Sequence, residues 1–471
     1  MKQLVWFRND LRLLDNPALH HSTVDGEGKV LGCYLLCRSY IDTHPVGAAK
    51  LHFIRQNLLI LARQLAACGI PFEVIAVNTP DEIAPAILAL CQRLKVERVS
   101  FNAEYPLDEV RRDRLVTDLL RQQNIDVKRY HDRVMVPPGM LKTGKGDMYK
   151  VYTPFMRQWL TKVTTTPFYT YSAPAITTRP LKVNTQAIED NFKDLPQKDL
   201  SALWPAGEEE ALRRLKQFCQ SALMQYRNDR DFPAIDGTSS LSPYLAVGVL
   251  SPKQCYIAAT QSTQENWQDN ESILTWVKEL IWREFYTHIV AAFPSLSRHQ
   301  PMQGHTRFFP WSYDKAAFKR WCEGQTGIPV IDAAMRQLNT TGWMHNRLRM
   351  VTAMFLTKNL RIHWQWGERY FMEQLIDGEF AANNGGWQWS ASTGTDAAPY
   401  FRIMNPVSQS KRFDADGEFI RRYVPELKAC DNKTIHAPVN HPDYPEPMVD
   451  LKLSRAETIT LFKELPSSAN G

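Results

Sequence analysis

The first 130 residues alternate short apolar runs with longer amphipathic stretches. The helical spacing of apolar positions predicts helices over Ala48–Cys68, Asp81–Leu94 and Asp108–Gln123. Apolar runs typical of buried strands lie at Leu4–Phe7, Val30–Leu36, Phe72–Val77, Glu97–Phe101 and Asp126–Tyr130. Strands that alternate with helices favour a parallel sheet covered on both faces. We therefore expect a doubly wound, Rossmann-like α/β domain over residues 1–130.

The pattern changes twice further along the chain. Prolines and threonines recur over residues 131–205, which indicates a long connector with one helix near Tyr149–Lys162. Over residues 206–471 strand signals fade, and we expect an all-helical domain. Its helical patterns cover residues 208–227, 243–259, 272–292, 314–322, 329–340, 343–360 and 367–376. The Gly- and Asn-rich segment Asn383–Asn405 is expected to be a loop, and the proline-rich tail beyond residue 430 to be irregular.

Composition narrows the class of protein. Hydrophobic residues make up 44% and charged residues 23% of the chain, which is typical of globular proteins and unlike disordered or fibrous ones. No apolar run approaches the length of a membrane span, and the N-terminus has no signal-peptide pattern. Of 13 tryptophans, only Trp6 and Trp159 precede residue 200. The uneven distribution of tryptophan therefore indicates that the two halves of the chain form different domains.

Charge and motif searches exclude several classes of site. The net charge of +6 permits an anionic partner such as a nucleic acid. The 8 cysteines form no Cys-x-x-Cys pair, which favours reduced thiols and a cytoplasmic location. The 12 histidines show no metal-binding spacing, so we expect no metal ion. The first strand runs into Arg8–Arg12 without a glycine, so the dinucleotide and Walker phosphate-binding motifs are absent.

One expected helix combines tryptophan with charged groups. Within residues 272–292, Trp276, Glu279, Arg283 and Tyr286 are spaced to share one face. A carboxylate on such a face is costly to bury unless it is paired or meets a ligand. Two interpretations stay open: an ion pair between Glu279 and Arg283, or a polar group facing an aromatic ligand.

One face of a second expected helix, and one loop, also allow either a structural or a ligand-binding interpretation. Within residues 343–360, Trp343, Asn346, Arg347 and Met350 are spaced to share a face. The segment Gly237–Pro243 carries hydroxyl groups at an expected helix start, which indicates either an anion site or an ordinary N-cap. Cations near tryptophans suit either nucleic-acid contact or a solvated surface, and they are Arg230, Arg347, Arg402, Lys411 and Arg412.

Several longer motifs resemble the photolyase/cryptochrome family. Val5–Arg12 followed by Asp15-Asn16 is similar to the opening of that family. The segments similar to its flavin domain are Gly237–Ser242, Glu279–Tyr286, Gly342–Met350 and Asp377–Trp389. The resemblance runs in order from residue 3 to about residue 427. It is closest to the bacterial class I DNA photolyases that act on cyclobutane pyrimidine dimers.

The resemblance implies a noncovalent FAD in the helical domain. Asn383 would face flavin N5, and Glu379 stands where close relatives have Asp. The phosphates and ribityl chain would be surrounded by Tyr226, Thr238, Ser239, Ser240, Leu241 and Ser242. The remaining contacts would come from Trp276, Arg283, Asn346, Arg349, Asp377, Gly378, Glu379 and Asn383.

The reaction implied by the resemblance is light-driven electron transfer from reduced FAD to a dimer flipped out of DNA. Glu279 would be the hydrogen-bond partner of the dimer, with Asn346 and Met350 also in contact. Enzymes for (6–4) photoproducts typically carry histidines at these last two positions, so cyclobutane dimers are favoured. Trp282 and Trp389 would wall the lesion site. Phosphates would be held by Arg230, Arg347 and Arg402.

The resemblance also implies two accessory systems. Trp387, Trp364 and Trp311 correspond to the family's electron-transfer chain. In folate-type members a methenyltetrahydrofolate antenna binds at positions that correspond here to His44, Asp108, Glu109 and Arg298. Relatives often have Asn at position 108 and Lys at position 298, so a deazaflavin or no antenna stays open.

Three functions are compatible with these motifs. The first is a repair enzyme that acts as a monomer on UV-damaged DNA, single- or double-stranded, without a membrane partner. The second is a cryptochrome, which signals blue light through its flavin and does not repair DNA. The third is a flavin-free nucleic-acid-binding protein. Glu279, Trp282, Asn346, Met350 and Trp389 favour repair.

Overall fold

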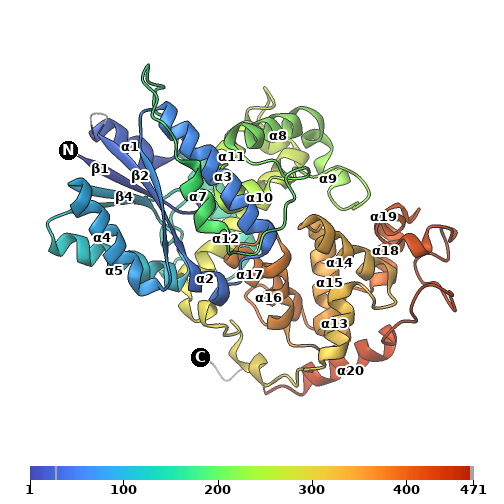
Figure 1. The fold of residues 1–471 in the computed structure, drawn as a ribbon. Coiled ribbons are helices and arrows are strands. Elements are labelled where there is room, and N and C mark those ends of the chain that lie inside the picture. The colour runs from blue at the N-terminus through green and yellow to red at the C-terminus, as the bar shows by residue number, and fades with distance from the viewer. Residues whose placement is uncertain (27–28, 467–471) are drawn as a thin grey trace.

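The computed structural model describes residues 1–26 and 29–466, and it has an α/β part and a helical part (Figure 1). The α/β part is built on a five-stranded, all-parallel sheet with strand order β3-β2-β1-β4-β5. The strands are β1 (Gln3–Phe7), β2 (Val30–Cys37), β3 (Phe72–Val77), β4 (Arg98–Asn102) and β5 (Asp126–Tyr130). The expected fold class, a doubly wound sheet followed by a helical domain, is confirmed.

Both faces of this sheet are buried. In β1, Leu4 and Trp6 join the cluster that contains Ile87 and Leu120, whereas Val5 and Phe7 join the cluster on the opposite face. Successive side chains of a strand point to opposite faces, which explains why all of β1 is apolar apart from Gln3. The covering helices are α1 (Pro17–Asp25), α2 (Arg38–Thr43), α3 (Ala48–Ala67), α4 (Ile83–Leu94) and α5 (Leu107–Gln122).

Three short helices differ from the expectation. The helices α1 and α2 show no clear apolar stripe, and α1 depends instead on its cap, where the Asn16 side chain accepts a hydrogen bond from the Leu19 N–H. The connector holds two helices and not one, α6 (Tyr152–Thr165) and α7 (Thr185–Phe192). The short helix α7 packs against α3 and β3, which supplies the stability that its own sequence does not signal.

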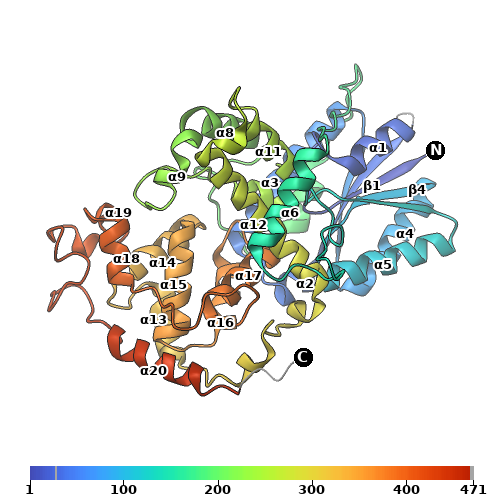
Figure 2. The ribbon, with the colours of Figure 1, turned by 180° about the vertical axis from the view of Figure 1, so that it is seen from behind.

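The remainder of the described chain is helical. Its centre is α12 (Glu271–Ala292), which packs against α6, α9, α11 and α17, and Figure 2 shows α6 beside it. The other helices before it are α8 (Glu208–Ser221), α9 (Tyr226–Asp229), α10 (Ser242–Val247) and α11 (Pro252–Thr260). Those after it are α13 (Lys315–Glu323), α14 (Pro329–Thr341), α15 (Asn346–Met354), α16 (Trp364–Gln374), α17 (Phe380–Ala391), α18 (Pro406–Phe413), α19 (Glu418–Tyr423) and α20 (Leu451–Lys463). No described helix is both long and apolar enough to cross a membrane.

The prediction of a loop over Asn383–Asn405 is wrong, because α17 extends to Ala391. One of its two glycines serves packing, because a side chain at Gly385 would collide with the ring of Tyr286. Gly367 on α16 lies in the same way against the ring of Trp387. Glycine therefore lets rings approach these helices closely, and tertiary packing outweighs its low helix propensity.

Three more helix boundaries differ from the expectation. The helix expected over 343–360 begins only at Asn346, so Trp343 precedes it, and Phe355–Asn359 is a π-helical turn. The helix expected over 243–259 is interrupted at Gly248, whose φ is +70° and whose Cα approaches the Asn9 carbonyl too closely for a side chain. The tail beyond residue 430 is not wholly irregular, since it contains α20, capped by Asp450.

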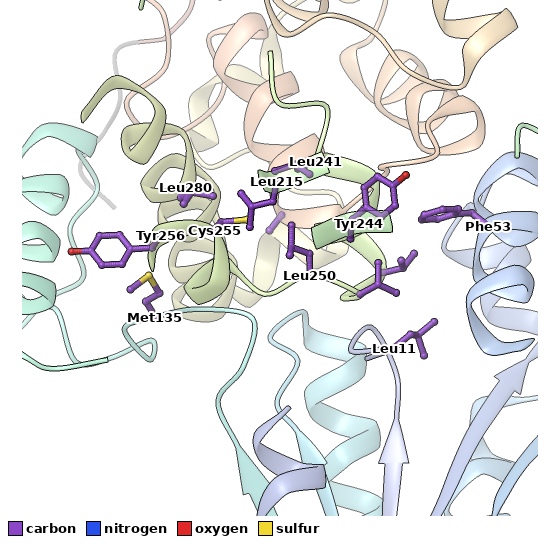
Figure 3. Close-up of a cluster of buried hydrophobic side chains, with 14 of the residues drawn as sticks. Leu11, Phe53, Met135, Leu215, Leu241, Tyr244, Leu250, Cys255, Tyr256 and Leu280 are labelled. Atoms are coloured by element: carbon purple, nitrogen blue, oxygen red, sulfur yellow. The ribbon is translucent and has the colours of Figure 1, made fainter. Parts of the chain in front are cut away.

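A continuous hydrophobic cluster joins the two parts and the connector (Figure 3). It includes Leu11 after β1, Phe53 of α3, Met135 of the connector, Tyr244 of α10 and Leu280 of α12. The rings of Phe53 and Tyr244 meet edge to face at 5.5 Å between centroids. The α/β part is thus packed against the helical part through a shared hydrophobic core, and is not joined to it by the connector alone.

Candidate functional site

Glu279 and Arg283 of α12 pair with distant partners and not with each other. Arg230 donates from Nη1 to Glu279 Oε1 at 2.7 Å. Arg283 instead donates to both carboxylate oxygens of Glu379, each at 3.0 Å. The ion pair considered between Glu279 and Arg283 does not form. Burial raises the pKa of Glu279, and the Arg230 guanidinium opposes that shift.

A row of alternating charges continues from Glu279 towards α18. Asp231 lies 3.9 Å from Arg230 and 2.7 Å from Arg347. Arg347 also stacks over the ring of Phe413 at 3.8 Å. Two of the three arginines expected to hold phosphates therefore meet at one edge of the site. The third, Arg402, is exposed in the segment between α17 and α18.

Glu379 is held by cations from two elements. Arg133 of the connector also donates to its carboxylate, at 2.6 Å. Burial would raise the pKa of Glu379, but Arg283 and Arg133 outweigh it and lower the pKa to about 2. The neighbouring Gly378 carbonyl accepts a hydrogen bond from Lys50 of α3. Glu379 is thus a fixed carboxylate that ties the connector to α12.

The residues expected to hold FAD include groups without a protein partner. Asp377 is paired with Arg349 at 2.7 Å through Oδ2, while its buried Oδ1 has no hydrogen-bond partner. The amide of Asn383 donates to the Glu368 carbonyl at 3.0 Å, which leaves its own oxygen free to accept. A buried carboxylate oxygen without a donor indicates a ligand that supplies one.

The loop before α10 also contains polar groups without a protein partner. Within the described chain, neither the hydroxyls nor the backbone N–H groups of Thr238, Ser239 and Ser240 are hydrogen-bonded to another residue. Ser240 has a φ of +49°, in the left-handed region. The residue that caps α10 is Leu241, which has no side-chain oxygen, so the ordinary N-cap interpretation does not hold.

The other residues expected around the phosphates and ribityl chain lie close to the core. Tyr226, Leu241 and Trp276 are buried, and the Ser242 hydroxyl accepts a hydrogen bond from the Trp343 indole at 3.2 Å. The free donors fit the phosphates and hydroxyls of a nucleotide.

The expected lesion-binding side chains come from three helices. Trp282 of α12 stacks on Tyr152 with 3.5 Å between ring centroids. Asn346 is exposed at the start of α15, and Met350, four residues on, is half-buried on the same helix. Trp389 is half-buried on α17. No described hydrogen bond joins Asn346, Met350 or Trp389 to Glu279.

The three tryptophans of the expected electron-transfer chain lie on connected elements. Trp364 begins α16, and Gly367, one turn later, touches the ring of buried Trp387. His363 lies between Trp364 and Trp311. The centroid of its ring is 6.2 Å from that of Trp364 and 5.5 Å from that of Trp311. A parallel bridge between Ser312 and Ile362 holds the last two segments together. Of the three tryptophans, Trp387 is buried and Trp311 is half-buried.

A cavity of about 580 Å³ lies between the α/β part and the helices. Its lining includes His44, Asp108 and Glu109, and His44 Nε2 is 3.3 Å from the Asp108 carboxylate. Arg298 is exposed and does not line the cavity, although Ser297 and His299 on either side of it do. Three of the four residues expected to bind an antenna therefore share one cavity.

Sequence reasoning missed several residues of the site. Tyr152, Arg133, Asp231 and Lys50 all contact expected site residues. Their partners are distant in sequence, and no local spacing signals the contacts. In the described part of the chain, no three His, Cys, Asp or Glu side chains are grouped to hold a metal ion.

Comparison with known proteins finds DNA photolyases along nearly the whole chain. A family model of DNA photolyase matches residues 3–175, and a model of the FAD binding domain of DNA photolyase matches residues 276–464. The deoxyribodipyrimidine photo-lyase of Vibrio cholerae is 43% identical, over 98% of this chain and 99% of that protein. The Escherichia coli protein of the same name is 42% identical, over 98% of both.

Solved structures agree with this result. A class III photolyase from Agrobacterium tumefaciens superposes with a TM-score of 0.87 at 33% identity, covering 98% of this chain and 97% of that one. A cryptochrome from Synechocystis gives 0.85 at 28% identity, covering 98% and 99%. The resemblance seen in the sequence is thereby confirmed: the chain belongs to the DNA photolyase family, with an FAD-binding helical domain.

Proposed function

We propose that this protein repairs cyclobutane pyrimidine dimers in DNA by light-driven electron transfer, as a deoxyribodipyrimidine photo-lyase. The curated relatives of that name match it at 42–43% identity over nearly its full length. The observation that carries the assignment is Glu279, a half-buried residue whose carboxyl group is paired with Arg230 alone and whose side chain is 32% exposed, on the same helix as Trp282. Such a carboxyl group has capacity left for a substrate.

The cofactor is FAD. When bound and reduced, it supplies the photoexcited electron that opens the cyclobutane ring and that returns afterwards. Thr238, Ser239 and Ser240 offer free donors to its phosphates, and Asp377 Oδ1 offers a free acceptor. Arg283 is held in place by Glu379, and the Asn383 amide is oriented by the Glu368 carbonyl with its oxygen free for flavin N5.

Glu279 would hold the lesion by a hydrogen bond. Burial raises the pKa of Glu279 while Arg230 lowers it, and in its protonated form the carboxyl group can donate to a pyrimidine carbonyl as that carbonyl gains negative charge. Asn346 and Met350 would contact the dimer, and Trp282 and Trp389 would stack on the flipped bases. Arg230, Arg347 and Arg402 would bind phosphates of UV-damaged DNA, single- or double-stranded.

Trp387, Trp364 and Trp311 would carry electrons inward from the surface. The interdomain cavity would hold a methenyltetrahydrofolate antenna through His44, Asp108 and Glu109, with Arg298 at its edge. We propose that residues 1–130 form the antenna domain, 131–205 the connector and 206–471 the repair domain. The protein would act as a monomer in the bacterial cytoplasm, where its DNA substrate lies.

Blue-light signalling is the second candidate function, since a cryptochrome is among the structural neighbours. One experiment separates the two. The chemically reduced protein is mixed with an oligonucleotide that carries one cyclobutane thymine dimer, and intact thymine is measured after near-UV light and after darkness. Light-dependent restoration supports repair. A yellow, flavin-bearing preparation that restores no thymine would contradict repair and favour signalling.

A further inference from the structure

The connector segment Lys150–Tyr152 contacts both sides of the proposed lesion site. We infer that Tyr152 is a positioning residue that fixes Trp282 and, through the following loop, Trp389. The inference rests on the proposed function, because it assumes that these two tryptophans receive the flipped bases.

The contact with Trp282 is a close parallel stack. The ring centroids of Tyr152 and Trp282 are 3.5 Å apart, and the ring planes differ by 3°. The Tyr152 hydroxyl donates to the Lys278 carbonyl at 2.9 Å, one turn before Trp282 on α12. Tyr152 is 7% exposed, so this arrangement is packed and not a surface contact. The indole is therefore held against both its helix and the connector.

Further rings limit the movement of Trp282. Phe285 lies edge-on to Trp282 at 5.8 Å, and the Tyr286 ring stacks with Trp282 at 5.7 Å with 29° between the ring planes. Because Tyr152 covers one face of the indole, that face is closed to a base. A ring already held in place loses little side-chain entropy when a base binds, which improves affinity.

The same connector segment is bonded to the loop behind Trp389. The Tyr152 N–H donates to Asp396 Oδ2 at 2.9 Å, and the Thr395 hydroxyl donates to the Lys150 carbonyl. From there the chain turns back, and the Ala398 N–H donates to the Trp389 carbonyl at 3.2 Å. One short segment thus links α12, which carries Trp282, with the end of α17, which carries Trp389.

The test measures the affinity for an oligonucleotide with one cyclobutane dimer and for the undamaged oligonucleotide, in the dark, with the flavin-loaded protein. Removal of the stack in Y152A should weaken dimer binding about three- to tenfold, the size expected for an aromatic pair. Binding of undamaged DNA and flavin absorbance should stay close to those of the unchanged protein, whereas the unfolding midpoint should fall, because Y152A empties a buried site. Y152F keeps the ring and should restore dimer binding.

Three further variants keep the test decisive. D396A alters only an exposed loop residue and should weaken dimer binding less than Y152A does. Y169A is the matched control, since Tyr169 is 76% exposed in the same connector, and it should change nothing. Equal dimer affinity in Y152A and the unchanged protein, with weakened binding in W282A, would overturn the inference and leave the proposed function intact. Unchanged binding in W282A would overturn the role of Trp282 itself.

Discussion

Two glutamates on α12 occupy opposite kinds of environment. Glu284 accepts hydrogen bonds from the Met135 and Val136 N–H groups, each at 2.8 Å, and from the Trp159 indole at 2.7 Å. Glu279, little more than one turn earlier, has only the Arg230 side chain. Glu284 is 2% exposed, whereas the Glu279 side chain is 32% exposed.

The difference separates a structural carboxylate from a functional one. Three donors from the connector satisfy Glu284, so the residue fixes the connector to the helical part and has no capacity left for a ligand. Glu279 has one partner on a flexible side chain, and a bound lesion can compete for its carboxyl group. Residue type does not distinguish the two; burial and the number of hydrogen-bond partners do.

The largest effect we expect separates the lesion chemistry proposed for α12 from the electron path proposed through Trp387, Trp364 and Trp311, none of which lies on α12. W387F should abolish photoreduction of the oxidised protein and spare repair by protein reduced chemically, because only the electron path is removed. Flavin absorbance under blue light measures this. The control is W321F, whose ring lies 6.0 Å from Trp387 but outside the proposed path. Rapid photoreduction in W387F would contradict the path.

E284A tests whether Glu284 holds the connector to α12. It leaves two backbone N–H groups and an indole N–H buried without an acceptor, which should lower the free energy of unfolding by about 3–5 kcal/mol. The measurement is thermal unfolding of the flavin-loaded protein, with exposed Glu265 replaced in E265A as the control. A midpoint equal to that of the control would show that Glu284 does not hold the connector.

His288, on the connector side of α12, should make the fold sensitive to acid, and Glu284, 3.8 Å away, opposes this effect because burial raises the pKa of its carboxyl group to about 7. His288 bonds to the Val136 carbonyl at 2.7 Å, and burial lowers its pKa from 6.5 to about 4. Because the folded protein holds this imidazole neutral, its contribution is complete above pH 6.5 and falls as the pH drops towards 4. The loss is about 3 kcal/mol by linkage. Unfolding midpoints between pH 7 and pH 4 should fall less steeply in H288Q, and equal slopes would contradict the assignment.

R230A tests the partner of Glu279 and should have the smallest effect. If Arg230 binds a phosphate, its loss weakens binding of damaged and undamaged DNA alike and lowers the salt dependence of log Kd by about one unit. Stability should change by about 1 kcal/mol or less, because the ion pair is partly exposed. An unchanged salt slope would remove Arg230 from the set of phosphate contacts.

The sequence predicted those features that depend on local pattern. The apolar runs located all five strands, and helical spacing placed Trp276, Glu279 and Arg283 on one helix. It did not predict the partners of these residues, since Glu279 and Arg230 are 49 positions apart and Arg283 and Glu379 are 96 apart. Local spacing favoured an i to i+4 pair that tertiary contacts replace.

The helix α17 shows a second reason for failure. Its glycines and asparagines have low helix propensity, yet the rings of Tyr286 and Trp387 need the space that Gly385 and Gly367 leave. That requirement becomes visible only after the helices are assembled. The resemblance to photolyases supplied the residue roles that pattern alone left open.

The central claim is that Glu279 acts on the lesion and Glu284 on the fold. The most direct test is the number of dimers repaired per absorbed photon in E279A, at saturating dimer, with E265A as the control. We expect a several-fold lower yield at unchanged flavin content and unchanged unfolding midpoint. A yield equal to that of the control would contradict it.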